Sequence, residues 1–217
     1  MNDFSIGMAL VDYIPVIAFA ISAFILLCEL YNKMSKSAFA LFSAGVIDVT
    51  IAGALKATWK LLYAFGACDF DALNKMFFPV QSIGFLLAGI GILMMLLEGR
   101  KSKSLLAVAP PIFSGTFVFV GIMVAGLGIM DTILCILAYK LKKPWIITIF
   151  ALSFVCSLCM GYLSSQSFDE AAMNWLAEGV NVVGQGAFLT GVILLKKYGL
   201  GDLKLGSEGS DGRESTI

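Results

Sequence analysis

The chain has 217 residues, of which 59% are hydrophobic and only 14% are charged. Soluble domains carry roughly 25% charged residues, so this composition excludes an ordinary soluble protein and is typical of a membrane protein. Fifteen basic and fifteen acidic residues balance, and the absence of histidine excludes histidine-containing zinc sites and a histidine general base.

Several apolar runs reach the length of about 20 residues that an α-helix needs to cross a bilayer. We therefore predict an all-α, polytopic membrane protein. The first run, at about 6–31, is too long for the apolar part of a signal peptide, so we expect it to remain as a span. In chain order, the predicted helices cover about 7–31, 38–64, 74–97, 104–121, 124–141, 144–164 and 172–197.

The segment 104–141 has two interpretations. One is a single long helix at about 112–139, entered through Pro110 and Pro111, which gives six helices. The other is two short helices joined near 121–126, which gives seven. Only the second places the basic loops together, as the positive-inside rule favours, so we predict seven helices with the N-terminus outside and the C-terminus inside. Lys75 then lies outside, and ten basic residues lie inside: Lys33, Lys36, Arg100, Lys101, Lys103, Lys140, Lys142, Lys143, Lys196 and Lys197.

The last predicted helix has an echo 100 residues earlier in the chain. A looser match relates Tyr31, Phe42 and Gly53 to Tyr139, Phe150 and Gly161. These similarities predict two parallel repeats, at about 7–99 and 124–198, joined by a linker helix at about 104–121. Residues 1–198 then form one transmembrane domain, and 199–217 form a disordered cytoplasmic tail. The echo pairs Asn74, Val80, Gln81, Gly84, Gly91 and Gly99 with Asn174, Val180, Asn181, Gly184, Gly191 and Gly199.

The three-plus-one-plus-three layout resembles that of the SWEET sugar facilitators and other PQ-loop proteins. The chain has no Pro-Gln pair, and the nearest sequence is Phe78-Pro79-Val80-Gln81. Seven helices with an external N-terminus are also similar to the layout of microbial rhodopsins, but Gln185 stands where their retinal lysine should lie. Both resemblances are limited to the layout, and neither implies a function for this chain.

Polar side chains inside the predicted helices are candidates for function, because an ionisable group in a bilayer costs several kcal/mol unless it is paired or hydrated. On the last helix, Asn174, Glu178, Asn181 and Gln185 are three or four residues apart and should form one stripe. The first, second, third and fifth helices carry the other candidates, which are Asp12, Asp48, Lys56, Gln81 and Asp131. We predict a water-filled pocket that opens outward, with its floor near Asp48 and Gln185.

Structural roles are alternatives for several of these residues. Lys60, one turn from Lys56, is expected to extend its ammonium group to the headgroups. Asp12 lies close enough to the outer interface to be solvated. Asp131 could instead cap a helix that begins near residue 128. Asp48 and Glu178 could pair with a lysine and stabilise helix packing.

The sequence favours a transporter or facilitator for a small polar or anionic metabolite in the plasma (inner) membrane. The first alternative is a ligand-sensing receptor or a binding subunit of a membrane complex. The least favoured alternative is an intramembrane enzyme that modifies lipids. Because it ranks last, we do not expect the protein to be an enzyme. Expected partners are membrane lipid, a small-molecule ligand, and a second copy or another membrane protein. We expect no nucleic acid, metal or cofactor.

Overall fold

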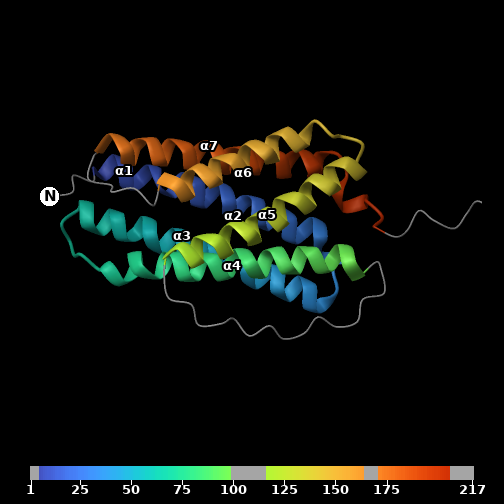
Figure 1. Cartoon of the computed structure of the whole chain (residues 1–217), viewed down its shortest axis with the longest axis horizontal. Helices are drawn as coiled ribbons and strands as arrows, with labels where there is room; N and C mark the ends of the chain where they lie inside the picture. Colours follow the sequence, from blue (N-terminus) through green and yellow to red (C-terminus); the bar gives the residue numbers. More distant parts are fainter. Residues whose placement is uncertain (1–4, 99–115, 164–170, 206–217) are drawn as a thin grey trace, which may run out of the picture.

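The computed structural model describes residues 5–98, 116–163 and 171–205. In these ranges all regular structure is helical, and the long helices run roughly along the long axis of an elongated bundle (Figure 1). The α-helices are α1 (Ile6–Val11), α2 (Tyr13–Leu30), α3 (Lys36–Ala64), α4 (Asp71–Glu98), α5 (Thr116–Lys140), α6 (Ile146–Leu163) and α7 (Ala171–Lys197), with short 3-10 helices η1 (Tyr31–Lys33) and η2 (Leu200–Asp202).

The bundle is compatible with an integral membrane protein. Large apolar side chains such as Ile17, Phe24 and Val155 are exposed on its outer surface, where lipid tails would cover them. Within the described ranges, α6 is apolar but shorter than a usual span, over Ile146–Met160. Five helical segments there are long and apolar enough to cross a membrane: Ile6–Lys33, Lys36–Ala64, Asp71–Leu97, Val118–Lys140 and Met173–Lys197.

Helices α1 and α2 form one span that is interrupted at Asp12. Pro15 has no N–H group to donate to the carbonyl of Val11, and its ring crowds that carbonyl, so the regular helix breaks one turn before the proline. The break leaves Asp12 only 8% exposed, inside the bundle. The expectation that Asp12 is solvated at the interface is therefore wrong.

The region predicted to contain two short helices differs in the structure. Helix α5 is continuous through 121–126, so the predicted break there is wrong, and over the described residues α5 corresponds to the long helix of the six-helix alternative. Gly126 serves close packing instead of a turn, because a Cβ atom on it would lie 2.5 Å from the carbonyl oxygen of Phe85 on α4. Most of the predicted linker helix, 104–121, lies outside the described residues, and its described part belongs to α5.

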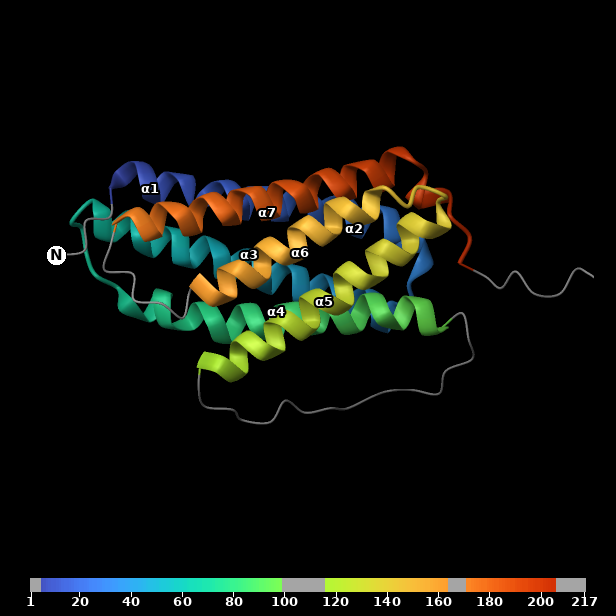
Figure 2. The same cartoon turned by 45° about the horizontal axis from the view of Figure 1, so that its top comes forward.

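Helices α4 and α5 run in the same direction. Ser82 of α4 donates a hydrogen bond of 2.7 Å to the carbonyl of Phe119 on α5. Seven residues farther along both helices, Gly89 packs against Gly126. Helices α2, α4, α5 and α7 all run toward the same end, and α3 and α6 return (Figures 1 and 2). That end, called the basic end below, carries Lys33, Lys36, Lys140, Lys142, Lys143, Lys196 and Lys197.

The first residues after α7 are packed against the basic end. Gly199 ends the helix with a left-handed φ of 87°, a conformation that glycine adopts without steric cost. Lys33 then donates hydrogen bonds of 2.7 Å to the carbonyls of Gly201 and Leu203, and the side chain of Leu200 is fully buried. The predicted tail therefore does not start at residue 199; its later part, 206–217, lies outside the described residues.

Close backbone contacts hold α3 against α4. A Cβ atom on Gly45 of α3 would meet the backbone nitrogen of Ala88 and would lie 2.5 Å from the carbonyl of Gly84, both on α4. Such small residues let membrane helices approach one another, since packing replaces the hydrophobic effect between helices in lipid. The contact aligns α3 with α4 and positions the polar residues of both helices over one cavity.

Candidate functional site

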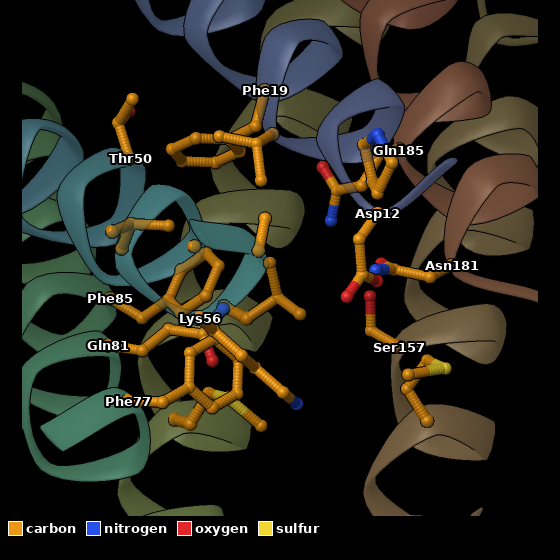
Figure 3. A pocket seen from close by; sticks show the side chains of 18 of the residues that line it. Asp12, Phe19, Thr50, Lys56, Phe77, Gln81, Phe85, Ser157, Asn181 and Gln185 are labelled. Carbon is orange, nitrogen blue, oxygen red and sulfur yellow. The ribbon is translucent and has the colours of Figure 1, made fainter. Parts of the chain in front are cut away.

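A cavity lies inside the bundle, toward the end opposite the basic end. It is lined by Asp12, at the break between α1 and α2, and by residues from each of the helices α2 to α7 (Figure 3). The cavity encloses about 960 Å³ of non-atom space, part of which is open to the surroundings. Its enclosed part has room for several water-sized molecules, which suits only a small ligand.

Three ionisable side chains form a buried cluster, called the Lys60 triad below. The Lys60 Nζ atom lies 2.6 Å from Asp12 Oδ2 and 2.5 Å from Glu178 Oε1. All three residues are less than 9% exposed. Lys60 therefore does not extend to the headgroups as predicted, because two carboxylates from neighbouring helices hold it inside. With all three groups ionised, the triad carries one excess negative charge.

Lys56 occupies the opposite wall of the cavity. Its ammonium nitrogen lies 4.1 Å from the ring centroid of Phe77 and 5.8 Å from that of Phe78. Aromatic faces attract cations through the ring quadrupole, which explains how the ammonium is held. Lys56 forms no ion pair with any residue that the structure describes. The wall therefore presents a cation without a direct counter-ion.

The wall formed by α7 is polar, as the predicted stripe indicates. Glu178, Asn181 and Gln185 line the cavity, and Ser157 of α6 lies beside them. Glu178 Oε2 and Gln185 Oε1 are buried and have no hydrogen-bond partner within the described ranges. Figure 3 shows this polar wall facing the wall that carries Lys56, Phe77, Gln81 and Phe85. The cavity is thus polar on one side and largely aromatic on the other.

Phenylalanine rings separate the polar part of the cavity from the basic end. Phe19 packs edge to face with Phe85, with ring centroids 5.7 Å apart, and stacks on Phe188 at 6.0 Å. Phe188 in turn contacts Phe150 at 5.9 Å. These four rings, called the phenylalanine layer below, occupy the level at which the sequence places a floor formed by Asp48 and Gln185.

The structure brings six of the nine predicted site residues to the cavity. Asp48 and Asn174 are partly buried elsewhere on α3 and α7 and do not line it. Sequence reasoning missed the pairing role of Lys60, although its position one turn from Lys56 placed both on one face. The six that line the cavity are Asp12, Lys56, Gln81, Glu178, Asn181 and Gln185.

Asp131 lies apart from the cavity, inside α5. Because α5 begins at Thr116, Asp131 cannot cap a helix near residue 128, and it lies in the half of α5 nearer the basic end instead of the outer half. Asp131 is 5% exposed, and neither carboxylate oxygen has a hydrogen-bond partner in the part of the chain that the structure describes. It is a buried acid without an evident partner, and its predicted ligand-binding role stays a prediction.

The comparisons with known proteins leave the site unassigned. Comparison with known proteins finds no matching family model, no similar curated protein and no similar solved structure. Among the described residues, no group of three or more cysteine or acidic side chains is placed to hold a metal ion. The function must therefore be argued from the cavity.

Proposed function

We propose that this protein is a membrane transporter or facilitator for a small polar or anionic metabolite that binds in the cavity. The observation that carries the proposal is a charged, roomy cavity inside an apolar bundle. Buried charges that only stabilise helix packing would need partners but no empty space, whereas Lys56 faces the cavity without a direct ion pair to any residue that the structure describes. An anionic group on a bound metabolite would supply a counter-ion.

The arrangement of the helices supports two parallel repeats, as the sequence predicts. The triplets α2–α3–α4 and α5–α6–α7 have the same sequence of directions (Figures 1 and 2). A Cβ atom on Gly91 would lie 2.5 Å from the backbone nitrogen of Phe42, and one on Gly191 would lie 2.7 Å from the ring of Phe150. The echo pairs Gly91 with Gly191, and the looser match pairs Phe42 with Phe150, so we propose a transporter built from two parallel triplets with its site between them.

We further propose that the basic end faces the cytoplasm and that the protein lies in the plasma (inner) membrane, as the positive-inside rule favours. The cavity then lies on the outer side of the phenylalanine layer. In this orientation the structure corresponds to an outward-facing state. Transport would require the layer formed by Phe19, Phe85, Phe150 and Phe188 to open toward the basic end.

Uptake into proteoliposomes tests the proposal. Liposomes with the purified protein are incubated with a defined mixture of amino acids, carboxylic acids, sugars and phosphate esters, and their contents are measured by mass spectrometry. We expect one chemical class to enter faster than into protein-free liposomes. Lys56→Gln should reduce this uptake at least tenfold, and Glu178→Gln should abolish it. Lys75→Gln, which removes a pair with Asp71 outside the cavity, should leave uptake unchanged.

Two results would contradict transport and favour an alternative. Stable ligand binding without uptake of that ligand indicates a receptor or binding subunit. A modified lipid, formed when the protein is incubated with mixed lipids, indicates an intramembrane enzyme. The transporter proposal is rejected if every chemical class enters protein-containing and protein-free liposomes at the same rate, in either orientation of the protein in the membrane.

A further inference from the structure

The cavity presents opposite excess charges on its two walls. On one wall, Asp12 and Glu178 share the single cation of Lys60, which leaves one negative charge uncompensated within the triad. On the other wall, Lys56 has ring contacts but no ion pair among the described residues. The charges of the whole site balance, but they are divided between the walls, and Figure 3 shows Asp12 and Lys56 on opposite sides of the cavity.

Hydrogen-bond capacity is divided in the same way. Glu178 Oε2 and Gln185 Oε1 are buried acceptors that lack a donor within the described ranges. The ammonium of Lys56 can only donate. A ligand that satisfies both walls must therefore bring donors to α7 and acceptors to Lys56. A buried acceptor that stays unpaired lowers affinity, so a ligand that brings a donor to these oxygens is preferred.

We propose that the cavity binds a small zwitterion of the amino-acid class. The carboxylate lies toward Lys56, the ammonium lies toward Glu178 and Gln185, and an apolar side chain packs against Phe19 and Phe78. This inference rests on the proposed function, since it names the substrate class of the same site. A simple anion would leave the acceptors of α7 unpaired, and a simple cation would be repelled by Lys56.

The test measures binding of matched ligands to the full-length protein in lipid nanodiscs. L-alanine, L-leucine, L-methionine and L-phenylalanine are the first probes, with thermal stabilisation and calorimetry as readouts. For leucine, 4-methylpentanoate lacks the ammonium group and 3-methylbutylamine lacks the carboxylate, and neither adds bulk. We expect at least one of the four amino acids to bind, and each singly charged analogue of it to bind at least about tenfold more weakly.

Substitutions test which wall of the cavity binds each charged group of the ligand. Because Lys56 has no ion pair to lose, Lys56→Gln should fold normally and bind leucine and 3-methylbutylamine with similar affinity. Glu178→Gln should instead remove the preference for leucine over 4-methylpentanoate, and its folded fraction is checked by size-exclusion chromatography. Lys75→Gln is the matched control and should keep both preferences.

Each other outcome overturns the inference. Equal binding of the amino acid and its des-amino analogue indicates an anion site, and equal binding of the decarboxylated amine indicates a cation site. Failure of all four amino acids to bind at millimolar concentration rejects a zwitterion site of this class. Uptake of a simple anion would then leave the proposed transport function standing, whereas amino-acid binding without uptake would contradict transport but keep the zwitterion site.

Discussion

The ammonium group of Lys60 lies 2.5 Å from Oε1 of Glu178, a contact that joins α3 to α7 across 118 residues of sequence. The same ammonium contacts Asp12, at the break between α1 and α2, at 2.6 Å. One side chain therefore links three spans inside an apolar bundle. Removing the lysine of this buried cluster leaves both carboxylates charged and unpaired, which is far more costly than the loss of a surface pair.

Replacement of Lys60 by methionine should destabilise the protein strongly. Lys60→Met keeps the length of the side chain but leaves the carboxylates of Asp12 and Glu178 together without a cation, at a cost of about 3–5 kcal/mol. Thermal unfolding in detergent micelles measures the change. Combining Lys60→Met with Asp12→Asn and Glu178→Gln should restore most of the lost stability. A single variant that unfolds at the wild-type temperature would show that the triad contributes nothing.

Close packing of α3 on α4 should make Gly45 intolerant of any side chain. A Cβ atom there would lie 2.5 Å from the carbonyl of Gly84, so Gly45→Ala forces the helices apart and should cost about 1–3 kcal/mol. Gly179→Ala is the matched control, because no atom lies within 4 Å of its Cβ position. Alanine is the better helix former, so the control should be neutral or slightly stabilising. Equal unfolding temperatures for the two variants would contradict the described packing.

The buried carboxylate of Asp131 should reduce stability. Asp131→Asn keeps the size of the side chain and cannot ionise, so we expect the variant to be more stable in alkaline buffer, where the wild-type carboxyl would have to carry a buried charge. Asp131→Lys should prevent folding, because it introduces a larger charged group at the same buried position. Chemical unfolding in micelles gives both values. Lower stability of Asp131→Asn would instead reveal a partner or bound cation at this carboxylate.

Leu200 should contribute to stability although it follows the last long helix. Its side chain is fully buried, and Leu200→Ala should cost about 2–5 kcal/mol by the usual penalty for a core cavity. Ile193→Ala on the exposed face of α7 is the control and should cost much less. The two unfolding temperatures are compared in the same detergent. If both variants unfold together near the wild-type value, residues 199–205 do not pack as described.

Periodicity and charge were sufficient to predict much of the bundle. A helix that crosses a bilayer needs about 20 apolar residues, so the spans could be located from apolar runs. The 3.6-residue repeat was sufficient to place Glu178, Asn181 and Gln185 on one face of α7, and all three line the cavity. The tendency of basic residues to share one side also indicated that Lys33, Lys143 and Lys196 gather at one end, as the structure has them.

Contacts between distant helices could not be predicted in this way. Spacing cannot tell a lysine that reaches the headgroups from one held inside by two carboxylates, because the answer depends on which helices pack together. Asp12 reaches Lys60 only because α1 and α2 break before Pro15 and lie against α3. Asp48 carries a carboxylate as Asp12 does, and it lies on the same helix as Lys56. It nevertheless does not line the cavity.

The role of a glycine also depends on which helices pack together. Gly126 can mark a turn or a close helix contact, and only the proximity of α4 to α5 decides between them. Composition and local periodicity are sufficient to locate most of the helices, their apolar faces and the common end of the basic residues, because these depend on each segment and the bilayer alone. The Lys60 triad, the cavity and the phenylalanine layer depend on packing between segments far apart in the chain, so they require the folded bundle.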